Sequence, residues 1–410
     1  MPPDRESSRE HGREIDWEAA TRDVVEQLQR LIRFPTINPP GDERAIADYL
    51  IGVLRAAGVK TRRIDTDANR SAVVATIRGS GARAPLMLVA HTDVVGVDAE
   101  RWSIDPFGGE LRDGYVYGRG AIDDKGMLAV NLVTMLLLQR QVARGHLVLE
   151  RDVVFLATPD EESGGAFGMQ WLVQHEPDLL NVEYAINEGG RIRVGADGSL
   201  TLLLQVAEKT SHIVTLTAHG TSGHAGVPRP DNSVLRLGRA LASISEYASD
   251  PAHGVSPTIV AGGAQSNVIP DQARATLNVR TTPDQQLSDV VGDLVRLVND
   301  ADVVIAVEEK GEGAPASSEG SALYAAIVET ARSLIPNVVV TPYLSAGVTD
   351  SARLRKLGVQ AYGILPFPLT LDDEGRMHGV DERVPVASLG FGVRLVYGSV
   401  ARTAAAQQLN

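Results

Sequence analysis

Acidic and histidine side chains follow three apolar stretches of the sequence, at the point where each stretch ends. His91 and Asp93 come directly after PLMLVA, three carboxylates at positions 160–162 follow RDVVFLA, and Glu188 follows VEYAI. Each apolar run predicts a buried β-strand, and open α/β sheets bind ligands at the carboxyl ends of their strands. Repulsion and desolvation oppose such a gathering of carboxylates, which favours a bound cation and leaves a solvated turn as the alternative.

Two further motifs carry acidic and imidazole groups. GRGAIDDKG places Asp123 and Asp124 in a glycine-rich turn at the head of a long helix, and MHGVDERV places His378 in a loop before the last helix. Taken alone, an aspartate at the head of a helix can serve as its N-cap, because the helix dipole favours it there. The turn is not a phosphate loop, since the Gly-x4-Gly-Lys-Ser/Thr spacing is absent. Only the conjunction of these loops with the acidic strand ends points to a metal.

Composition narrows the class of protein. The chain has no cysteine, so disulfides and thiolate metal sites are excluded, and a transition metal would be held by histidine and carboxylate. The net charge of -13 argues against nucleic-acid and membrane-surface partners, which prefer basic faces. No signal peptide is recognisable, and no continuous run approaches the ~20 apolar residues of a membrane span. We therefore expect a cytoplasmic protein whose residues 1–14 form a disordered polar tail.

The elements that must position these groups predict two domains, as is usual for 410 residues. Residues 15–209 and 317–410 alternate helices with short apolar strands, which indicates an α/β domain with a sheet covered by helices. Residues 210–316 follow the order β-α-β-β-α-β of a ferredoxin-like unit, inserted into the first domain. Helices are expected over 16–34, 42–58, 127–144, 232–248, 287–300, 321–335 and 386–405, and strands over 71–77, 84–90, 151–157, 182–186, 212–220, 258–269, 272–281 and 302–310.

The motifs, in this order, resemble those of the M20 metallopeptidase family, the group of aminoacylases, succinyl-diaminopimelate desuccinylases, carnosinases and glutamate carboxypeptidases. The resemblance runs from about Asp16 to the C-terminus and includes the insert. It implies a zinc-exopeptidase-like fold with a mixed sheet, and an insert that acts as a lid and dimerisation domain. It rests on His-x-Asp at His91 and Asp93, Gly-Arg-Gly-x-x-Asp ending at Asp123, the pair Glu161 and Glu162, Asn-Glu-Gly at Glu188, Gly-His at His224, and the late His378.

The resemblance implies a site for two zinc ions, with cobalt or manganese as possible substitutes. Asp123 would bridge both ions, and the peptide bond that follows it is often cis in the family. The other implied ligands are His91 and Glu188 for one ion, and Glu162 and His378 for the second.

Two carboxylates receive other roles through the resemblance. Asp93 would accept a hydrogen bond from the non-ligating nitrogen of His91 and so fix its tautomer. Glu161 would act as the general base towards water and then pass the proton to the leaving amine. The first member of the acidic triplet, Asp160, is expected to be a solvated or capping residue.

The insert would complete the site. His224 would stabilise the oxyanion, commonly in the cleft of a partner subunit. Asn267 and Arg280 resemble positions that hold the carboxylate of the substrate, with a surface salt bridge as the alternative role for Arg280.

A late segment also matches the family. Thr349 begins its Thr-Asp-Ser segment and is a candidate substrate-binding residue. The aminoacylase-like pattern has an arginine after this segment, whereas this sequence has Ala352 there and Arg353 one place later.

The expected function is hydrolysis of the amide bond of an N-acyl amino acid or a short peptide with a free carboxylate, by a homodimer that pairs through the insert. A non-enzymatic binding protein on the same scaffold is one alternative, disfavoured because Glu161 has no duty as a ligand. A dinuclear phosphohydrolase is another. It is disfavoured because the insert offers Asn, His and one Arg rather than a cluster of cations.

Overall fold

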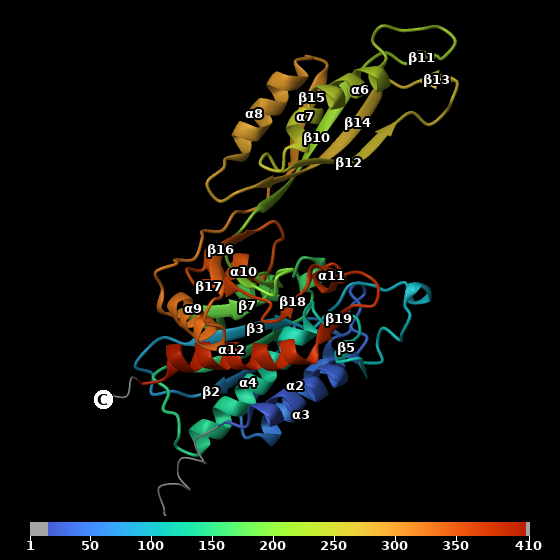
Figure 1. Ribbon diagram of the computed structural model, residues 1–410. Helices are drawn as coiled ribbons and strands as arrows, with labels where there is room; N and C mark the ends of the chain where they lie inside the picture. Colours follow the sequence, from blue (N-terminus) through green and yellow to red (C-terminus); the bar gives the residue numbers. More distant parts are fainter. Residues whose placement is uncertain (1–14, 407–410) are drawn as a thin grey trace, which may run out of the picture. The chain divides into compact units, whose positions relative to one another are not determined.

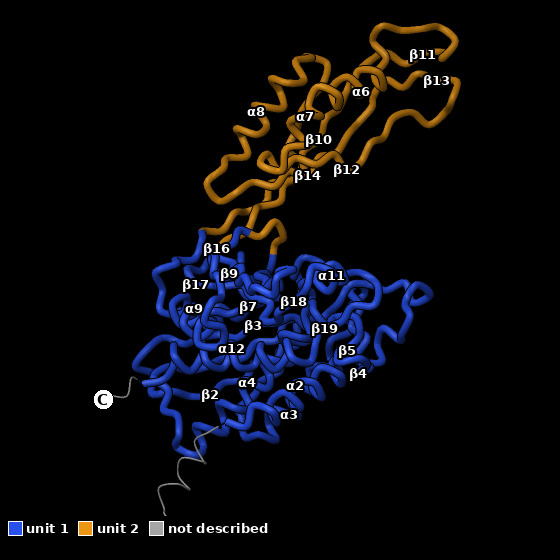
Figure 2. The backbone as a smooth tube through the Cα atoms, viewed as in Figure 1, with its two compact units in different colours: residues 1–206, 316–344, 349–410 blue, residues 207–315, 345–348 orange. Residues whose placement is uncertain are grey.

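The computed structural model describes residues 15–406, which form two compact units (Figure 2). Unit 1 takes the described residues up to Val206, residues 316–344, and those from Thr349 onward; unit 2 takes residues 207–315 and 345–348. The polar tail expected at residues 1–14 lies outside the described residues. Residues 345–348, predicted to belong to the α/β domain that the insert interrupts, group with unit 2 in the structure. The reason is hydrogen bonding, because Ser345 O accepts from Lys209 N at 2.8 Å and Ala346 O accepts from Arg280 Nη1 at 2.9 Å.

A mixed ten-stranded sheet forms the centre of unit 1 (Figure 1). Its order is β1-β2-β6-β3-β7-β17-β9-β8-β18, and β16 also pairs with β9. The neighbours β6, β3, β7 and β17 are parallel, whereas β1 with β2 and β2 with β6 are antiparallel. The strands are β1 (Lys60–Asp65), β2 (Ser71–Ile77), β3 (Leu86–His91), β6 (Val153–Thr158), β7 (Tyr184–Asn187), β8 (Arg191–Val194), β9 (Leu200–Glu208), β16 (Val339–Ser345), β17 (Gln360–Gly363) and β18 (Pro368–Leu369).

Helices cover both faces of this sheet, which confirms the expected α/β class. Alternation along β3 sends Leu86 and Leu88 into one apolar core and Met87 and Val89 into the other. The first core lies under α2 (Trp17–Ile32), α3 (Arg44–Ala56), α4 (Lys125–Ala143), α9 (Ala322–Leu334) and α12 (Val386–Ala404). The second lies under α5 (Met169–His175) and α10 (Asp350–Lys356), and the short α11 (Leu371–Glu374) follows β18.

Helix α4 differs from the expectation that no segment is apolar enough to span a membrane. Among the described residues it alone is long and apolar enough, by length and composition, to cross a membrane. In the structure 72% of its apolar window is buried, and it packs against α2, α12 and β3. These contacts are typical of a core helix.

A small antiparallel sheet joins two distant parts of unit 1. Its order is β19-β5-β4, and Arg383 pairs with Tyr117. The strands are β4 (Glu110–Arg112), β5 (Tyr115–Tyr117) and β19 (Arg383–Pro385). They are too short to leave a periodic pattern in the sequence. The pairing brings the chain just before Asp123 next to the chain just after His378.

Unit 2 has the expected ferredoxin-like order of elements around an antiparallel sheet β12-β14-β10-β15. The helix expected over 232–248 is interrupted at Ile244. The strand expected over 258–269 ends at Gly262, because the chain turns at Gly263 with φ +76°. The elements are β10 (Thr210–His219), β11 (Gly223–His224), α6 (Ser233–Ser243), α7 (Ser245–Ser249), β12 (Val255–Gly262), β13 (Val268–Ile269), β14 (Gln272–Thr281), α8 (Leu287–Val298) and β15 (Val303–Glu309).

Candidate metal centre

Three neighbouring parallel strands of unit 1 deliver the candidate side chains to one edge of the sheet. His91 is the last residue of β3 and pairs with Thr158, the last residue of β6. Glu161 and Glu162 follow β6 in a single 3₁₀ turn, and Glu188 directly follows β7. The strand order β6-β3-β7 therefore brings all of these groups to the same carboxyl edge. The sequence predicted this convergence from the strand ends.

Two groups of side chains there could each hold an ion. Ligand atoms of His91, Glu161 and Glu188 lie within 4.8 Å of one another. Those of His91, Asp123 and Glu162 do the same. The second group joins three predicted ligands. The first includes Glu161, which the sequence analysis assigned as a base and not as a ligand.

Asp123 lies between two histidines. Its Oδ1 is 2.9 Å from His91 Nε2, and its Oδ2 is 3.2 Å from His378 Nε2. His378 Nε2 is also 3.2 Å from Glu162 Oε1, a buried oxygen. The two oxygens of one carboxylate thus face two different imidazoles, as a carboxylate that bridges two ions must. The structure brings all five predicted ligands together.

Asp93 organises the backbone around these groups. It is fully buried, and its carboxylate accepts hydrogen bonds from the backbone N–H groups of Glu161 and Glu162, both at 3.1 Å. His91 Nδ1 lies 3.5 Å from Asp93 Oδ1 and closer, at 3.0 Å, to the backbone oxygen of Asp93. The backbone oxygen and Oδ1 of Asp93 therefore orient the His91 ring. The carboxylate of Asp93 also holds the loop of Glu161 and Glu162.

Asp160 differs from the expectation of a solvated or capping residue, because it is only 2% exposed. Its carboxylate accepts hydrogen bonds from Arg70 Nη1 at 2.7 Å, Asn38 Nδ2 at 2.9 Å and the backbone N–H of Phe167 at 2.8 Å. Asn38 also donates to Asp93 at 2.8 Å. Sequence reasoning missed Arg70 and Asn38, since a single polar residue in a loop carries no pattern that marks it.

Asp124 occupies the N-cap position of α4, but its side chain makes no capping hydrogen bond to the helix. Instead Asp124 Oδ2 accepts from the backbone N–H of His91 at 3.2 Å. The peptide bond between Asp123 and Asp124 is cis, as the resemblance implied. The N-cap alternative is therefore correct for the position of Asp124 and wrong for its side chain.

Without a cation, protons must balance the charge of these carboxylates. Burial lowers the pKa of the His91 imidazole, but hydrogen bonds with Asp123 and Asp93 outweigh this effect and raise it well above its usual range. Hydrogen bonds with Asp123 and Glu162 raise the pKa of His378 to about 10. Burial, followed by repulsion from Glu188, raises the pKa of Glu161 far above normal. This donor set of imidazole and carboxylate groups fits divalent metal ions, which would take the place of those protons.

The candidate residues of unit 2 do not all lie together. His224 is exposed on the β11–β13 ribbon, and its neighbour Ala225 donates its backbone N–H to Asn267 O at 3.0 Å. Arg280 lies at the other end of the unit 2 sheet, where β14 pairs with the first residues of β10. The ten-residue strand β10 separates the two places by about 30 Å. Within one chain, Asn267 and Arg280 are not brought together.

Arg280 bonds neutral oxygens rather than a carboxylate. Its Nε donates to Asn278 Oδ1 and its Nη1 to Ala346 O, both at 2.9 Å. These contacts differ from the surface salt bridge considered as an alternative. They hold the guanidinium beside the segment 345–348 of the same unit.

The late segment around Thr349 packs against the acidic loop. Thr349 is buried, and its hydroxyl accepts from Ser351 N at 3.1 Å as the N-cap of α10. Arg353 donates to the backbone oxygen of Gly164, and its Nη1 is 3.6 Å from Asp350 Oδ1. The arginine one place beyond Ala352 thus contacts the loop that carries the candidate base.

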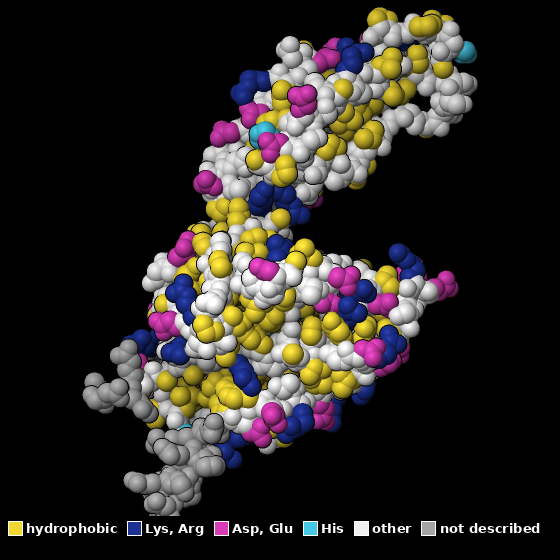
Figure 3. Space-filling view, viewed as in Figure 1, with side chains coloured by type: hydrophobic (Ala, Val, Ile, Leu, Met, Phe, Trp, Pro, Cys, Tyr) yellow, Lys and Arg dark blue, Asp and Glu magenta, His cyan; other side chains and the backbone are white. Residues whose placement is uncertain are grey.

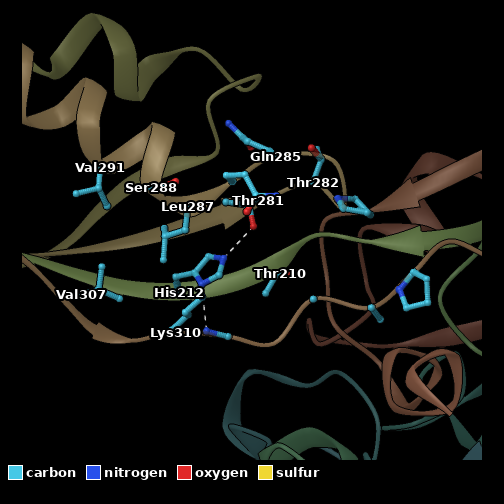
Figure 4. Close-up of a pocket in the computed structure, with 16 residues that line it drawn as sticks. Thr210, His212, Thr281, Thr282, Gln285, Leu287, Ser288, Val291, Val307 and Lys310 are labelled. Carbon is cyan, nitrogen blue, oxygen red and sulfur yellow. Dashed lines mark hydrogen bonds between the residues drawn. The ribbon is translucent and has the colours of Figure 1, made fainter.

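Unit 2 contains a cavity of ≈ 610 Å³ that is lined by residues of this unit (Figure 4). His212 lies in its wall, where Nδ1 accepts from Gly311 N at 3.1 Å and Nε2 faces Thr281 Oγ1 at 2.8 Å. Burial, with the charge of Lys310, lowers the pKa of His212. These contacts fix a neutral imidazole as part of the wall, and the cavity contains none of the predicted site residues.

Comparison with known proteins identifies a family. The model of peptidase family M20/M25/M40 matches residues 87–402. An N-fatty-acyl-amino acid synthase/hydrolase, PM20D1 from Xenopus tropicalis, is 25% identical over 90% of this chain and 83% of its own length. The succinyl-diaminopimelate desuccinylase of Magnetococcus marinus is 29% identical over 90% of this chain and 94% of its own.

Solved structures share the fold. An M20 family metallo-carboxypeptidase from Sulfolobus solfataricus has a TM-score of 0.69 and 18% identity, and the match covers 93% of this chain and 99% of that one. The YXEP protein of Bacillus subtilis, described as a dinuclear metal binding peptidase, has a TM-score of 0.68 and 17% identity, with coverage of 94% and 98%. These similarities bear out the zinc-exopeptidase-like fold.

Proposed function

Because the chain belongs to peptidase family M20/M25/M40, a family of hydrolases that act on amides and peptides, we propose that it hydrolyses an amide bond at a centre with two metal ions. The substrate class that we propose is an N-acyl amino acid or a short peptide with a free carboxylate. The observation that carries the proposal is the placement of Asp123 between His91 and His378, with Glu161 in the same cluster.

The ligand assignment is the one that the family resemblance implies, and the contacts of Asp123 with His91 and with His378 support it. His91 and Glu188 would share one ion with Asp123, and Glu162 and His378 would share the other. We propose zinc, since histidine and carboxylate are donors that zinc accepts, and cobalt or manganese could occupy the same positions. When bound, such ions supply Lewis acidity to a carbonyl oxygen and lower the pKa of a water molecule.

Glu161 is the proposed general base. Its carboxylate would take a proton from the attacking water and deliver it to the nitrogen of the leaving amine. The carboxylate of Asp93 accepts the backbone N–H of Glu161 at 3.1 Å, and this bond restrains the main chain from which the Glu161 side chain extends. The matching hydrogen bond from Glu162 holds its neighbour in the role of a ligand.

A homodimer through unit 2 is part of the proposal. Strand β12 is an edge strand with β14 as its one neighbour in the sheet, and its Ile259 and Val260 are 60% and 63% exposed. Figure 3 shows further hydrophobic side chains on the surface of unit 2. An exposed apolar edge favours pairing with a second copy. In such a dimer His224 would stabilise the oxyanion in the partner's site.

The proposed substrate-binding residues are those that the family resemblance implies. Arg280 would hold the carboxylate of the substrate, because a guanidinium binds a carboxylate with two parallel hydrogen bonds. Asn267 lies on the ribbon of His224, at the other end of the sheet, so it would act together with His224 from the partner. Thr349 would contribute from unit 1, at the start of α10.

The names of the two curated relatives described above favour an acylated amino compound, whereas the solved structures are named as peptidases. One is named for N-fatty-acyl-amino acids and the other for succinyl-diaminopimelate, and both names describe an acyl group on an amine. The decisive assay incubates zinc-loaded protein with a panel of N-acyl amino acids and dipeptides and measures the free amine. Release of amine from acyl amino acids supports the proposal. Binding without release would favour a non-enzymatic protein, and turnover of p-nitrophenyl phosphate alone would favour a phosphohydrolase.

A further inference from the structure

A buried ion pair in unit 1 joins the two loops that carry Asp123 and His378. Arg119 and Glu382 are 2% and 0% exposed, and Arg119 Nη1 donates to Glu382 Oε2. Both residues lie at the end of the small sheet, where Gly118 N donates to Glu382 O at 2.9 Å. The pairing of β5 with β19 therefore brings these two side chains together.

The carboxylate of Glu382 binds the turn that leads to Asp123. Its oxygens accept hydrogen bonds from three backbone N–H groups: Gly120 at 3.2 Å, Ile122 at 2.8 Å and Asp123 at 3.2 Å. Three such bonds to one buried anion define the path of the backbone at the candidate bridging ligand.

The guanidinium of Arg119 binds the loop of His378 in the same way. Its Nη2 donates to the backbone oxygens of His378 at 3.2 Å and Gly379 at 3.0 Å, 259 and 260 positions away in the sequence. The guanidinium carbon also lies 5.4 Å from the centre of the Trp102 ring, which packs against the guanidinium. His378 has a φ of 60°, in the left-handed region, so its loop depends on contacts of this kind to keep its shape.

We propose that Arg119 and Glu382 are positioning residues, which set the distance between Asp123 and His378 and so determine the affinity for the ion that these two share with Glu162. Desolvation makes a buried ion pair a poor source of stability by itself. Here, however, one partner binds the backbone of one ligand and the other partner binds the backbone of the second. The inference rests on the proposed metal centre.

Two substitutions test Arg119 and Glu382 separately. Arg119→Lys keeps a buried positive charge beside Glu382 but lacks the planar fork that reaches both carbonyl groups. Glu382→Gln keeps the shape of the side chain but removes the charge that holds the three N–H groups. Glu183→Gln is the control. Glu183 also pairs with a buried arginine, Arg151, at 2.8 Å. It lies at the amino end of β7, whereas the candidate ligand Glu188 follows the carboxyl end of the same strand.

The measurement is the affinity of the full chain for each of two Zn²⁺ ions, by competition with a chromophoric chelator. The visible spectrum with Co²⁺ serves as a second readout. We expect Arg119→Lys to bind one ion about 10–100-fold more weakly, the usual cost of losing a partner behind a metal ligand, and to leave the other affinity unchanged. Glu382→Gln should weaken both ions, because its carboxylate holds the backbone of Asp123, the proposed bridge between them. The control should match the wild type. The Co²⁺ bands should shift in both variants and not in the control.

Several results would overturn the inference. Unchanged affinities and spectra in folded variants, with only a lower thermal stability, would show that the pair stabilises the fold and does nothing for the metal. Equal weakening of both ions by Arg119→Lys would also contradict it, because His378 is the proposed ligand of one ion only. Arg119→Lys decides the case if Glu382→Gln does not fold. A wild-type chain that binds no metal would instead reject the proposed function, so the two failures can be told apart.

Discussion

The carboxylate of Asp93 accepts the backbone N–H of Glu161 at 3.1 Å, and this bond links the strand of His91 to the loop of the proposed base. Replacement by Ala removes it, together with the matching bond to Glu162. We expect Asp93→Ala to lower kcat by about 10–100-fold, because the base and a ligand lose their common anchor. Steady-state kinetics and zinc titration measure the effect.

The control for that substitution is Asp197→Ala. Asp197 also accepts a backbone N–H, from Ser199 at 3.0 Å, but it does so in the exposed turn between β8 and β9. Its loss should leave kcat unchanged. Equal kinetics of the Asp93 variant and the wild type would refute the positioning role of Asp93.

Zinc binding should release protons. In the metal-free chain hydrogen bonds with Asp123 and Glu162 raise the pKa of His378 to about 10, so this imidazole is charged at pH 8. A metal binds the neutral ring, and each proton that it displaces makes the affinity rise about tenfold per pH unit below that pKa. We expect a pH indicator in weak buffer to show acidification when Zn²⁺ is added at pH 8. Binding without proton release, with an affinity independent of pH between 7 and 9, would contradict this account of the charge balance.

Asp160 should stabilise the fold through Arg70. Both side chains are buried, and removal of the carboxylate leaves the guanidinium with a smaller set of partners. We expect Asp160→Ala to lower the free energy of unfolding by about 3–5 kcal/mol, as is usual when one partner of a buried ion pair is lost. Urea denaturation measures the change.

An exposed pair provides the comparison for Asp160. Arg30 and Glu26 are bonded on α2 with side chains 51% and 57% exposed, so Glu26→Ala should cost less than about 1 kcal/mol. Similar losses in the two variants would show that burial does not set the strength of the Arg70 pair.

The dimer can be tested by mixing subunits. If His224 serves the site of the partner, His224→Ala and Glu161→Gln chains should each be inactive alone. A mixed dimer then has one complete site, with an intact Glu161 from one chain and an intact His224 from the other. We expect co-expression to restore part of the activity, measured by release of free amine. No recovery in a confirmed mixed dimer would place His224 in the site of its own chain or outside catalysis.

The strand ends and the fold were the most predictable features. Apolar runs such as SAVVATI mark strands by themselves, and β2 covers that run from end to end. The polar strand β1 (KTRRID) was missed, because as an edge strand it needs no apolar face. The three-residue strands of the small sheet were missed as well, since pairing between segments so far apart leaves no local pattern.

Some residues of the candidate site could be predicted from the sequence and others could not. The predicted ligands are acidic and imidazole groups at strand ends, in a glycine-rich turn and in a loop, and the sequence motifs identified them. Asp160 was misjudged, because Arg70, which neutralises it, is 90 positions away and carries no mark in the sequence. Arg119 and Glu382 stood inside quoted motifs, yet their contact spans 263 positions and follows only from the pairing of β5 with β19.

The central claim is that five side chains hold two divalent ions while Glu161 stays free to move protons. The most direct test measures the metal content and the turnover of Glu161→Gln side by side. The account predicts two ions per chain, as in the wild type, with kcat lower by about 10²–10⁴-fold. Loss of an ion from this variant would instead make Glu161 a ligand, in line with its place beside His91 and Glu188, and turnover near the wild-type value would remove it from catalysis.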